Sequence, residues 1–413
     1  MNKQQLSIGL FGFGCVGYGL YQVLGKTSGI QASIKKVCIK HPEKSRPVKE
    51  SFFTVNPSDI LDDPSINIVV ELTDDADAAF EIVKQALERG KAVVTANKKM
   101  VSEHFAELIQ LQKLYNVPVL YEAAACASIP IIRNLEEYYD NDTLSLITGI
   151  VNGSTNYILS RALNEGLSFD NALQIAQSLG YAESNPSLDV DAWDAAYKLQ
   201  ILCAHAFGVV LDAKDIARIG IRSIGEAEFQ YAREKNYKIK LLAKAFKSSE
   251  TSISAFVMPT FVSSESPLFG VDDVFNGVLT ETAFADRQFF SGKGAGAYPT
   301  ASAVLSDISA LSYKYQYEYK KINRVEVPDF TTDVLIEAYI RVPLELVGIA
   351  LSVFDDIHER HQDIKGAYLI GLANLRFLND FARNFPEASV VVLNTLSESV
   401  KVFDLPKLQA EQV

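Results

Sequence analysis

A glycine-rich turn follows the first apolar segment of this chain, and it limits what the N-terminal part can fold into. The apolar segment Leu6–Phe11 leads into Gly12, Gly14 and Gly17, and a helical pattern comes next. Small residues here let backbone N–H groups approach a dinucleotide pyrophosphate at a helix N-terminus. The pattern favours a dinucleotide site over the alternative, a purely structural turn. The predicted cofactor contacts in this turn are Gly12, Gly14, Cys15, Val16 and Gly17.

Short apolar segments alternate with helical patterns up to about residue 121, which is typical of a doubly wound parallel sheet. The predicted strands are Leu6–Phe11, Val37–Lys40, Ile68–Leu72, Ala92–Thr95 and Val117–Tyr121. A helix over Ala76–Arg89 ends at Gly90, and the next is expected to begin near Ser102. The sequence therefore predicts an α/β fold with a Rossmann-like nucleotide domain at residues 1–130.

After residue 130 the pattern changes to mixed strands and helices, which we interpret as a substrate and dimerisation domain at residues 131–320. Its predicted elements are a strand Thr148–Val151, helices from Thr155, over Ser168–Leu179 and over Asp191–Phe207, and strands Ile253–Phe261 and Asp273–Thr282. A helix near 300–312 is expected to return to the first domain.

A third domain is predicted at residues 330–413. Its expected order is a strand Val334–Val342, helix Leu344–His361, strand Ile364–Leu372, helix Arg376–Asn384 and strand Ser389–Leu393. This βαβαβ pattern predicts a small, separate α/β module at the C-terminal end.

Composition excludes several classes of partner. A formal net charge of −12 over 413 residues, without a basic stripe, disfavours nucleic acid and anionic membranes. No apolar stretch approaches the roughly 20 residues of a membrane span, and a strand begins almost at the N-terminus, where a cleavable signal would stand. Four cysteines stand singly, as expected of reduced thiols. We therefore expect a cytoplasmic protein with a small-molecule substrate.

The loop after the second strand bears on cofactor choice. In many dinucleotide sites an acid at the end of this strand accepts a hydrogen bond from the adenosine ribose 2′-hydroxyl. Here that place is taken by Lys40 and His41, and Lys44 and Arg46 follow. Cations can pair with a 2′-phosphate, so NADP is expected, with NAD possible. A solvated basic loop is an equally good interpretation.

Lysines and acids in two segments are candidates for proton transfer. Lys98 follows the strand Ala92–Thr95, where side chains of a parallel sheet face the crevice, although most loop lysines are simply solvated. Asp194 and Lys198 are four residues apart and share one helix face, which is also common on exposed helices. Their neighbours are mostly apolar, however, and the acids Glu183, Asp189 and Asp191 precede them. A buried acid cluster of this kind suits a cationic amino group.

The segment Tyr121–Pro130 combines Glu122 with a series of small residues. A single carboxylate with nearby carbonyl oxygens suits a monovalent cation such as sodium, and a tightly packed crossover is the alternative. None of the five histidines lies in these segments, which disfavours Ser–His–Asp hydrolysis and His-ligated metals.

Taken in order, these motifs resemble the homoserine dehydrogenase family over roughly residues 6–310. The most specific motifs are Asn152–Tyr157, the block Leu179–Leu199 and the loop Gly294–Val304. The resemblance implies reversible NAD(P)-dependent hydride transfer between homoserine and aspartate 4-semialdehyde, in threonine and methionine biosynthesis. It also implies a homodimer or a higher homo-oligomer.

The resemblance assigns roles to individual residues. It implies that Glu183 and Asp194 hold homoserine, and that Asp189, Tyr181 and Thr155 line the pocket. Lys198 would act as the acid–base group, and Lys98 would touch nicotinamide and orient the reacting oxygen. The implied cofactor contacts are Thr73, Lys98, Gly180 and Gly296, to which the basic loop adds Lys40, and the implied sodium ligands are Glu122, Ala125, Ala127 and Ile129.

Three places depart from the family. Thr73-Asp74-Asp75 stands where a glycine pair usually follows Glu71-Leu72, and Cys126 and Ser128 interrupt the small residues of the cation segment. The C-terminal module resembles the ACT regulatory domain but lacks its Asp-Lys-Pro-Gly turn, so threonine feedback is doubtful. The alternatives are another amino-acid dehydrogenase of the same architecture and a non-catalytic nucleotide-sensing protein.

Overall fold

The computed structural model describes residues 6–140 and 144–394, and its contacts divide the chain into two compact units. Unit 1 comprises residues 6–140 and 292–320, and unit 2 comprises residues 144–291 and 321–394. The ends of the predicted first and third domains, 1–5 and 395–413, lie outside the described residues. The division into three domains stays a prediction.

Unit 1 is built on a six-stranded parallel sheet with the order β3-β2-β1-β4-β5-β6. The strands are β1 (Leu6–Phe11), β2 (Ala32–Cys38), β3 (Phe53–Thr54), β4 (Ile68–Glu71), β5 (Ala92–Thr95) and β6 (Val119–Leu120). The direction of winding reverses between β1 and β4, and this is the place where open α/β sheets bind ligands.

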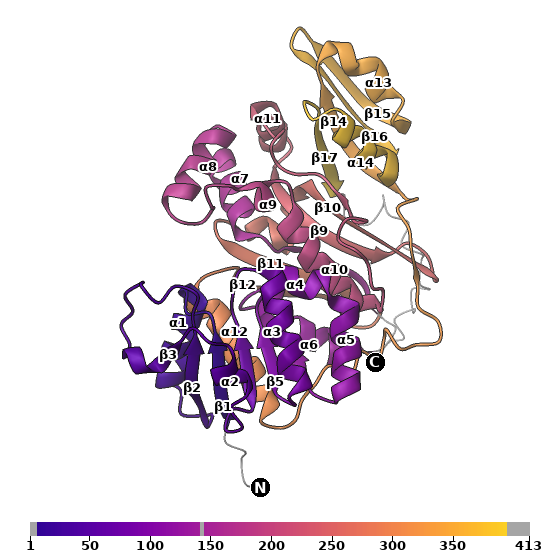
Figure 1. The fold of residues 1–413 in the computed structure, drawn as a ribbon. Coiled ribbons are helices and arrows are strands. Elements are labelled where there is room, and N and C mark those ends of the chain that lie inside the picture. Colours follow the sequence, from indigo (N-terminus) through magenta and orange to yellow (C-terminus); the bar gives the residue numbers. More distant parts are fainter. Residues whose placement is uncertain (1–5, 141–143, 395–413) are drawn as a thin grey trace, which may run out of the picture. The chain divides into compact units, whose positions relative to one another are not determined.

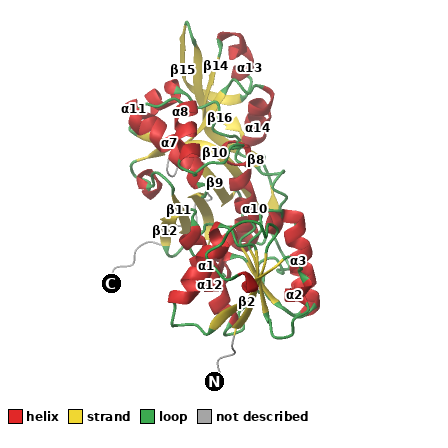
Figure 2. Ribbon diagram, turned by 60° about the vertical axis from the view of Figure 1, so that its left-hand side comes forward, coloured by secondary structure: helices red, strands yellow, loops and turns green. Residues whose placement is uncertain are grey.

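Helices cover both faces of this sheet, with α1 and α12 on one side and α2 and α3 on the other (Figure 2). They are α1 (Cys15–Lys26), α2 (Ser58–Leu61), α3 (Ala76–Glu88), α4 (Lys98–Glu103), α5 (Phe105–Tyr115), α6 (Ile132–Glu137) and α12 (Ala297–Leu311). Because a Cβ at Gly19 of α1 would come within 2.7 Å of the Ala297 carbonyl oxygen, these two distant segments pack closely (Figure 1).

Unit 2 is built on a mixed sheet whose main path is β12-β11-β7-β9-β10-β17-β14-β16-β15. Its strands are β7 (Leu144–Ile150), β8 (Ala217–Arg218), β9 (Tyr237–Lys247), β10 (Ser252–Ser263), β11 (Phe275–Thr282), β12 (Asp286–Lys293), β13 (Asp329–Phe330), β14 (Leu335–Val342), β15 (Phe354–Asp363), β16 (Gly366–Asn374) and β17 (Ser389–Asn394). Its helices are α7 (Gly153–Glu165), α8 (Phe169–Ser178), α9 (Ser187–Val190), α10 (Trp193–Phe207), α11 (Glu226–Glu234), α13 (Val347–Leu351) and α14 (Leu375–Asn384).

The C-terminal strands continue the sheet of unit 2. Strand β17 pairs in parallel with β10, with Thr260 opposite Val392. One apolar core includes Phe256 of β10, Ile340 of β14 and Leu369 of β16. Strands β14–β17 are therefore joined to the rest of unit 2 through both backbone pairing and a shared core.

The predicted α/β fold is confirmed, with a Rossmann-like domain and a mixed-sheet domain, but several elements differ. The predicted helix Leu344–His361 is wrong in its second half, because the chain leaves α13 and forms β15, which pairs along β16. The C-terminal order is therefore βαββαβ, and its assignment as ACT-like stays a prediction. Strands β9 and β12 were not predicted. Among the described residues no helix has the length and apolar character needed to cross a bilayer.

Candidate active site

The glycine turn of unit 1 has the shape that a dinucleotide needs. Gly12 follows β1 with φ +88°, and a Cβ there would lie 2.5 Å from the Leu72 carbonyl oxygen. A Cβ at Gly17 would lie 2.4 Å from the Gly12 carbonyl oxygen. Gly14, by contrast, has open space around it at the start of α1. This leaves room beside Gly14 at the N-terminus of the 12-residue helix α1, where helices favour anions.

Residues around the turn were predicted as cofactor contacts. Cys15 and Val16 are the first two residues of α1, and Cys15 is exposed. Lys40 is exposed just after β2, as is Lys44. The Arg46 guanidinium donates to the Lys44 carbonyl oxygen (2.8 Å). The basic loop thus presents at least two ammonium groups to solvent.

Thr73 and Lys98 lie at the carboxyl edge of the parallel sheet. Thr73 follows β4, and Lys98 is the first residue of α4, half-buried, directly after β5. The predicted helix start near Ser102 is wrong, because the Asn97 side chain accepts from the Met100 N–H (3.0 Å) and begins the helix four residues earlier.

Gly180 and Gly296 both have the backbone conformation that favours glycine. Gly296 has φ +120° and precedes α12 in unit 1. Gly180 has φ +75° and ends the segment after α8 in unit 2. Both glycines were predicted to contact the cofactor. Because they belong to different units, the structure describes the surroundings of each glycine only within its own unit.

The predicted cation segment is buried and its acid is already bonded. Glu122 Oε1 accepts from the backbone N–H groups of Ile131 (2.6 Å) and Ile132 (2.8 Å), and Oε2 accepts from that of Arg133 (2.9 Å). Its carboxylate therefore closes the N-terminus of α6. Ala127 has φ +48°, which is uncommon for alanine.

The other predicted sodium ligands are the backbone carbonyl oxygens of Ala125, Ala127 and Ile129. No group of three His, Cys, Asp or Glu side chains within the described ranges gathers as a metal site would require.

In unit 2 the structure gathers most of the predicted substrate residues around one asparagine. The Asn152 amide nitrogen donates to Asp189 Oδ1 (2.6 Å) and to Asp194 Oδ2 (2.8 Å). Its amide oxygen accepts from the Thr155 N–H (2.8 Å) and hydroxyl (3.0 Å). Lys198 Nζ donates to Asp194 Oδ2 (2.7 Å) and to the Val151 carbonyl oxygen (2.7 Å).

Asn152 was not among the predicted site residues. It stands immediately before Gly153-Ser154-Thr155, and an asparagine at this place is a common helix N-cap, which is one of its roles here. The cap pattern could have located the residue. Its contacts with two acids depend on the return of the chain near residue 189, which local spacing does not reveal.

The other predicted substrate residues lie on the segment between α8 and α9. Glu183 and Tyr181 have exposed side chains, and the Tyr181 ring packs against Tyr157 (5.0 Å between centroids). The Ser154 hydroxyl donates to the Tyr181 carbonyl oxygen. Asp191, which was expected in the acid cluster, instead pairs with Arg222 (2.5 Å).

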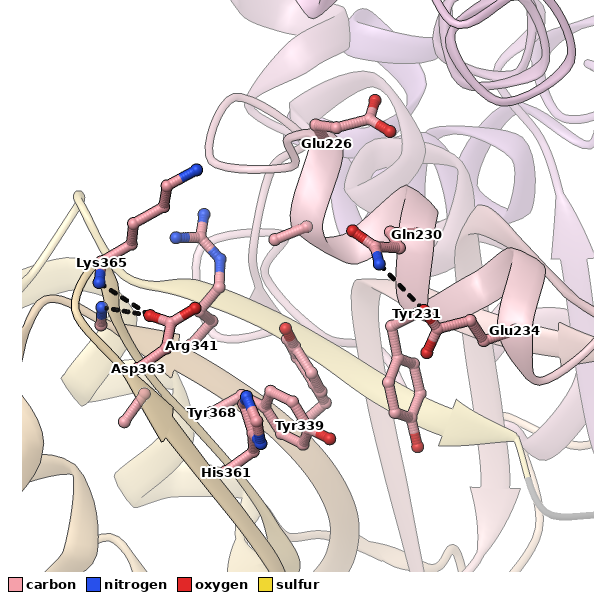
Figure 3. Close-up of a pocket in the computed structure, with 13 residues that line it drawn as sticks. Glu226, Gln230, Tyr231, Glu234, Tyr339, Arg341, His361, Asp363, Lys365 and Tyr368 are labelled. Carbon is pink, nitrogen blue, oxygen red and sulfur yellow. Dashed lines mark hydrogen bonds between the residues drawn. The ribbon is translucent and has the colours of Figure 1, made fainter.

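A pocket of about 710 Å³ lies in unit 2 between α11 and the β15–β16 hairpin (Figure 3). Tyr231 extends from α11, and Tyr339 of β14 and Tyr368 of β16 lie on the strand side together with Arg341. Arg341 is already paired with Glu228 (2.5 Å), and the Asp363 carboxylate accepts from two backbone N–H groups. None of the predicted site residues lines this pocket.

Comparisons with known proteins match nearly the whole of the first three quarters of the chain. A family model described as the NAD binding domain of homoserine dehydrogenase matches residues 12–122, and one described as homoserine dehydrogenase matches residues 130–309. A homoserine dehydrogenase of Synechocystis sp. is 40% identical over 313 residues, covering 73% of this chain and 72% of that protein. One of Lactococcus lactis is 37% identical over 314 residues, covering 73% of each.

Solved structures extend the similarity. A homoserine dehydrogenase from Thiobacillus denitrificans has a TM-score of 0.84 and 29% identity, covering 94% of this chain and 98% of that one. A hyperthermophilic archaeal homoserine dehydrogenase mutant in complex with NADPH has a TM-score of 0.64 and 27% identity, covering 76% of this chain and 100% of that one.

Proposed function

Since the chain belongs to the homoserine dehydrogenase family, we propose that it catalyses reversible NAD(P)-dependent hydride transfer between L-homoserine and L-aspartate 4-semialdehyde. The observation that carries this proposal is the cluster in unit 2, where Asn152 and Lys198 meet on the Asp194 carboxylate. Carboxylates in this cluster suit a substrate ammonium, and the lysine suits a reacting hydroxyl.

The chain's own residues account for the acid–base work. A nicotinamide cofactor, when bound at the Gly12 turn, supplies or accepts the hydride. As homoserine is oxidised, the neutral Lys198 amine would take up the hydroxyl proton, and the ammonium that forms would stabilise the negative charge that develops on the carbinol oxygen. In the reverse direction Lys198 would return a proton to that oxygen. Lys98 would orient and polarise the same oxygen.

Glu183 and Asp194 would bind the substrate ammonium, with Asp189, Tyr181 and Thr155 around it. Asp194 is almost fully buried and shares one oxygen between Lys198 and Asn152. A carboxylate held by two donors keeps one orientation, which a bound zwitterion requires. Glu183 is exposed in this structure and is available to a ligand.

Steady-state kinetics test the function. We expect NADPH oxidation that depends on aspartate 4-semialdehyde, and NADP reduction that depends on homoserine, with NAD compared in parallel. Binding of NADPH without turnover would favour the nucleotide-sensing alternative. Turnover of a different amino alcohol, with homoserine inert, would favour another amino-acid dehydrogenase.

We also propose that the enzyme prefers NADP, because exposed Lys40 and Lys44 follow β2 where an acid would repel the 2′-phosphate. Replacing both by glutamate should raise the KM for NADP by about tenfold or more and leave that for NAD within about twofold. Lys26, at the exposed end of α1, offers a charge-reversal control in the same unit. An equal rise for both cofactors would overturn the preference.

We propose a monovalent cation site at Glu122 and the backbone carbonyls of Ala125, Ala127 and Ile129. The left-handed backbone of Ala127 supports it, because strained residues of this kind persist where the surroundings require them. The cation would hold the turn in place rather than take part in the reaction. Sodium should raise the melting temperature relative to a large organic cation at equal ionic strength, and an unchanged melting temperature would overturn the site.

The remaining parts of the proposal concern assembly and compartment. We propose a homodimer or higher homo-oligomer, which light scattering on the purified chain would test. We also propose a cytoplasmic location, because the four cysteines are all free in the structure.

A further inference from the structure

Glu71 is a buried carboxylate that the proposed reaction does not use. It ends β4, and the residue is fully buried. Its three hydrogen-bond donors are neutral: the Thr73 N–H (2.6 Å), the Thr73 hydroxyl (2.6 Å) and the Thr95 hydroxyl (2.7 Å). Burial raises the pKa of Glu71, and the hydrogen bonds from Thr73 and Thr95 oppose that rise. Burying a carboxylate among neutral partners lowers the stability of the fold, so an apolar side chain of similar size would be less destabilising at this position.

These contacts form part of a closed ring that joins the carboxyl ends of β4 and β5. The Thr95 hydroxyl, which donates to Glu71 Oε2, also accepts from the Asn97 N–H (3.0 Å). The Asn97 amide nitrogen donates to the Thr73 carbonyl oxygen (3.2 Å). The ring therefore returns to Thr73, whose N–H and hydroxyl are bonded to Glu71 Oε1.

The ring joins the two segments of this sheet edge that contain the predicted ligand contacts Thr73 and Lys98. Asn97 caps α4, so its position sets the backbone of the next residue, Lys98. Thr73 belongs to the loop that packs against the glycine turn, since Gly12 could not carry a Cβ without meeting the Leu72 carbonyl oxygen. Loss of the acceptor at Glu71 would free both segments together.

We infer that Glu71 is a positioning residue that holds Thr73 for the cofactor and Lys98 for the reacting oxygen, through Thr95 and Asn97. This inference rests on the proposed function for the role of Lys98. It assigns to Glu71 no contact with cofactor or substrate. Its effect passes through three neutral donors, from Thr73 and Thr95, and through the helix cap Asn97.

Glu71→Gln is the main test, because it preserves shape and replaces one acceptor oxygen by a donor. We expect kcat with homoserine to fall about 10- to 100-fold, the range given by loss of a hydrogen bond to a charged group. The dissociation constant for NADPH, measured by fluorescence titration, should rise at least about threefold. Glu81→Gln, on the exposed face of α3 in the same unit, is the matched control and should leave both values unchanged.

A double-mutant cycle with Lys98→Ala separates positioning from a merely structural role. If Glu71 acts through Lys98, Glu71→Gln should lower kcat less than about threefold in the Lys98→Ala background. Full multiplication of the two effects on kcat would overturn the inference, as would an unchanged kcat and NADPH affinity in Glu71→Gln. If wild-type protein binds NADPH but does not turn over homoserine, the proposed function fails, and the NADPH titration still tests how Glu71 holds Thr73.

Thr95 supplies a second pair of variants in case Glu71→Gln does not fold. Thr95→Val removes the hydroxyl that joins Glu71 to Asn97, whereas Thr95→Ser retains it. We expect the valine variant to lose kcat about tenfold and the serine variant to recover at least half of the wild-type value. Equal kcat values for the two variants would overturn the inference.

Discussion

In unit 2 two buried lysines, Lys198 and Lys240, each pair with an aspartate at a similar distance, but they differ in how many other acceptors surround them. Lys198 on α10 lies 2.7 Å from Asp194, and Lys240 on β9 lies 2.9 Å from Asp272. Each lysine also donates to a backbone carbonyl. Lys240 has two further acceptors, Asn156 and Ser160, and its side chain is 1% exposed, against 11% for Lys198.

This difference decides what each lysine can do. An ammonium has three N–H donors, and the four acceptors around Lys240 saturate it. Within the described part of the chain, Lys198 has two hydrogen-bond acceptors, so one N–H remains for a substrate oxygen. A buried pair with a spare donor can move a proton, whereas a saturated pair holds elements together. Lys240 in this way ties β9 to α7 and to the segment before β11.

The same substitution at the two lysines should give opposite outcomes, and this is the largest expected effect. Lys198→Met should lower kcat by about 10²- to 10⁴-fold, because a positioned proton-transfer group is lost. Lys240→Met should leave kcat within about threefold for protein that remains folded. Steady-state kinetics with homoserine measure both. Comparable losses of kcat in the two variants would remove the distinction between the pairs.

Lys240 should instead affect the free energy of unfolding, in a way that depends on pH. Burial lowers the pKa of Lys240 from 10.5 to about 8, with Asp272 opposing the shift. Below about pH 8, Lys240 is charged in both the folded and the unfolded protein. Between about pH 8 and 10.5, Lys240 is protonated mainly in the unfolded protein. The stability of wild type relative to Lys240→Met should therefore rise with pH across this window, by up to about 3 kcal/mol.

Chemical denaturation of wild type and Lys240→Met at several pH values measures this difference. Other groups that titrate in the window, such as Lys244, do so in both proteins and cancel. A difference in unfolding free energy that stays flat or falls from pH 8 to 10 would contradict the lowered pKa of Lys240.

A substitution at Asn152 tests the arrangement of the two acids, Asp189 and Asp194, that it contacts. Asn152→Asp would place a third carboxylate between Asp189 and Asp194, and both would lose a donor. We expect kcat/KM for homoserine to fall about 10- to 100-fold, the value of a hydrogen bond to a charged group. The KM for NADPH should stay within about twofold.

An exposed asparagine on α8, Asn171, provides the control for Asn152→Asp. Asn171→Asp makes the same chemical change away from the acid cluster and should leave kcat/KM unchanged. A selective rise in the KM for NADPH in Asn152→Asp, with homoserine kinetics intact, would contradict the arrangement around Asp194.

The two pairs also show what the sequence could reveal. Asp194 and Lys198 were found because four residues on one helix define a shared face. Lys240 and Asp272 lie on segments 32 residues apart in the chain, and strand β9 itself was not predicted. The fold brings the segment before β11 next to β9, and a local sequence pattern carries no record of that contact. The contacts of Asn152 with Asp189 escaped for the same reason.

The C-terminal strand β15 gives a second instance. Its sequence, Phe354–Asp363, is mostly polar, and most of its residues are exposed. Nothing local distinguishes it from an exposed helix, so a continuation of α13 was predicted. Hydrogen bonding along β16 overrides that weak preference, because intrinsic strand propensity depends on context. Charged side chains on such an edge also oppose pairing with another chain.

Asp75 provides the smallest expected effect, because its carboxylate meets backbone alone. Its side chain accepts from the Ala78 N–H (3.1 Å) as the N-cap of α3. Asp75→Ala should lower the free energy of unfolding by about 1 kcal/mol, and Asp75→Gly by only a few tenths, with kcat unchanged in both. Denaturant unfolding measures the two losses.

Asp77→Ala, in the exposed first turn of the same helix, is the control. It removes an acid without removing the cap and should lower the free energy of unfolding less than Asp75→Ala does. If Asp77→Ala cost as much, the contribution of Asp75 would come from charge near the helix N-terminus rather than from its hydrogen bond.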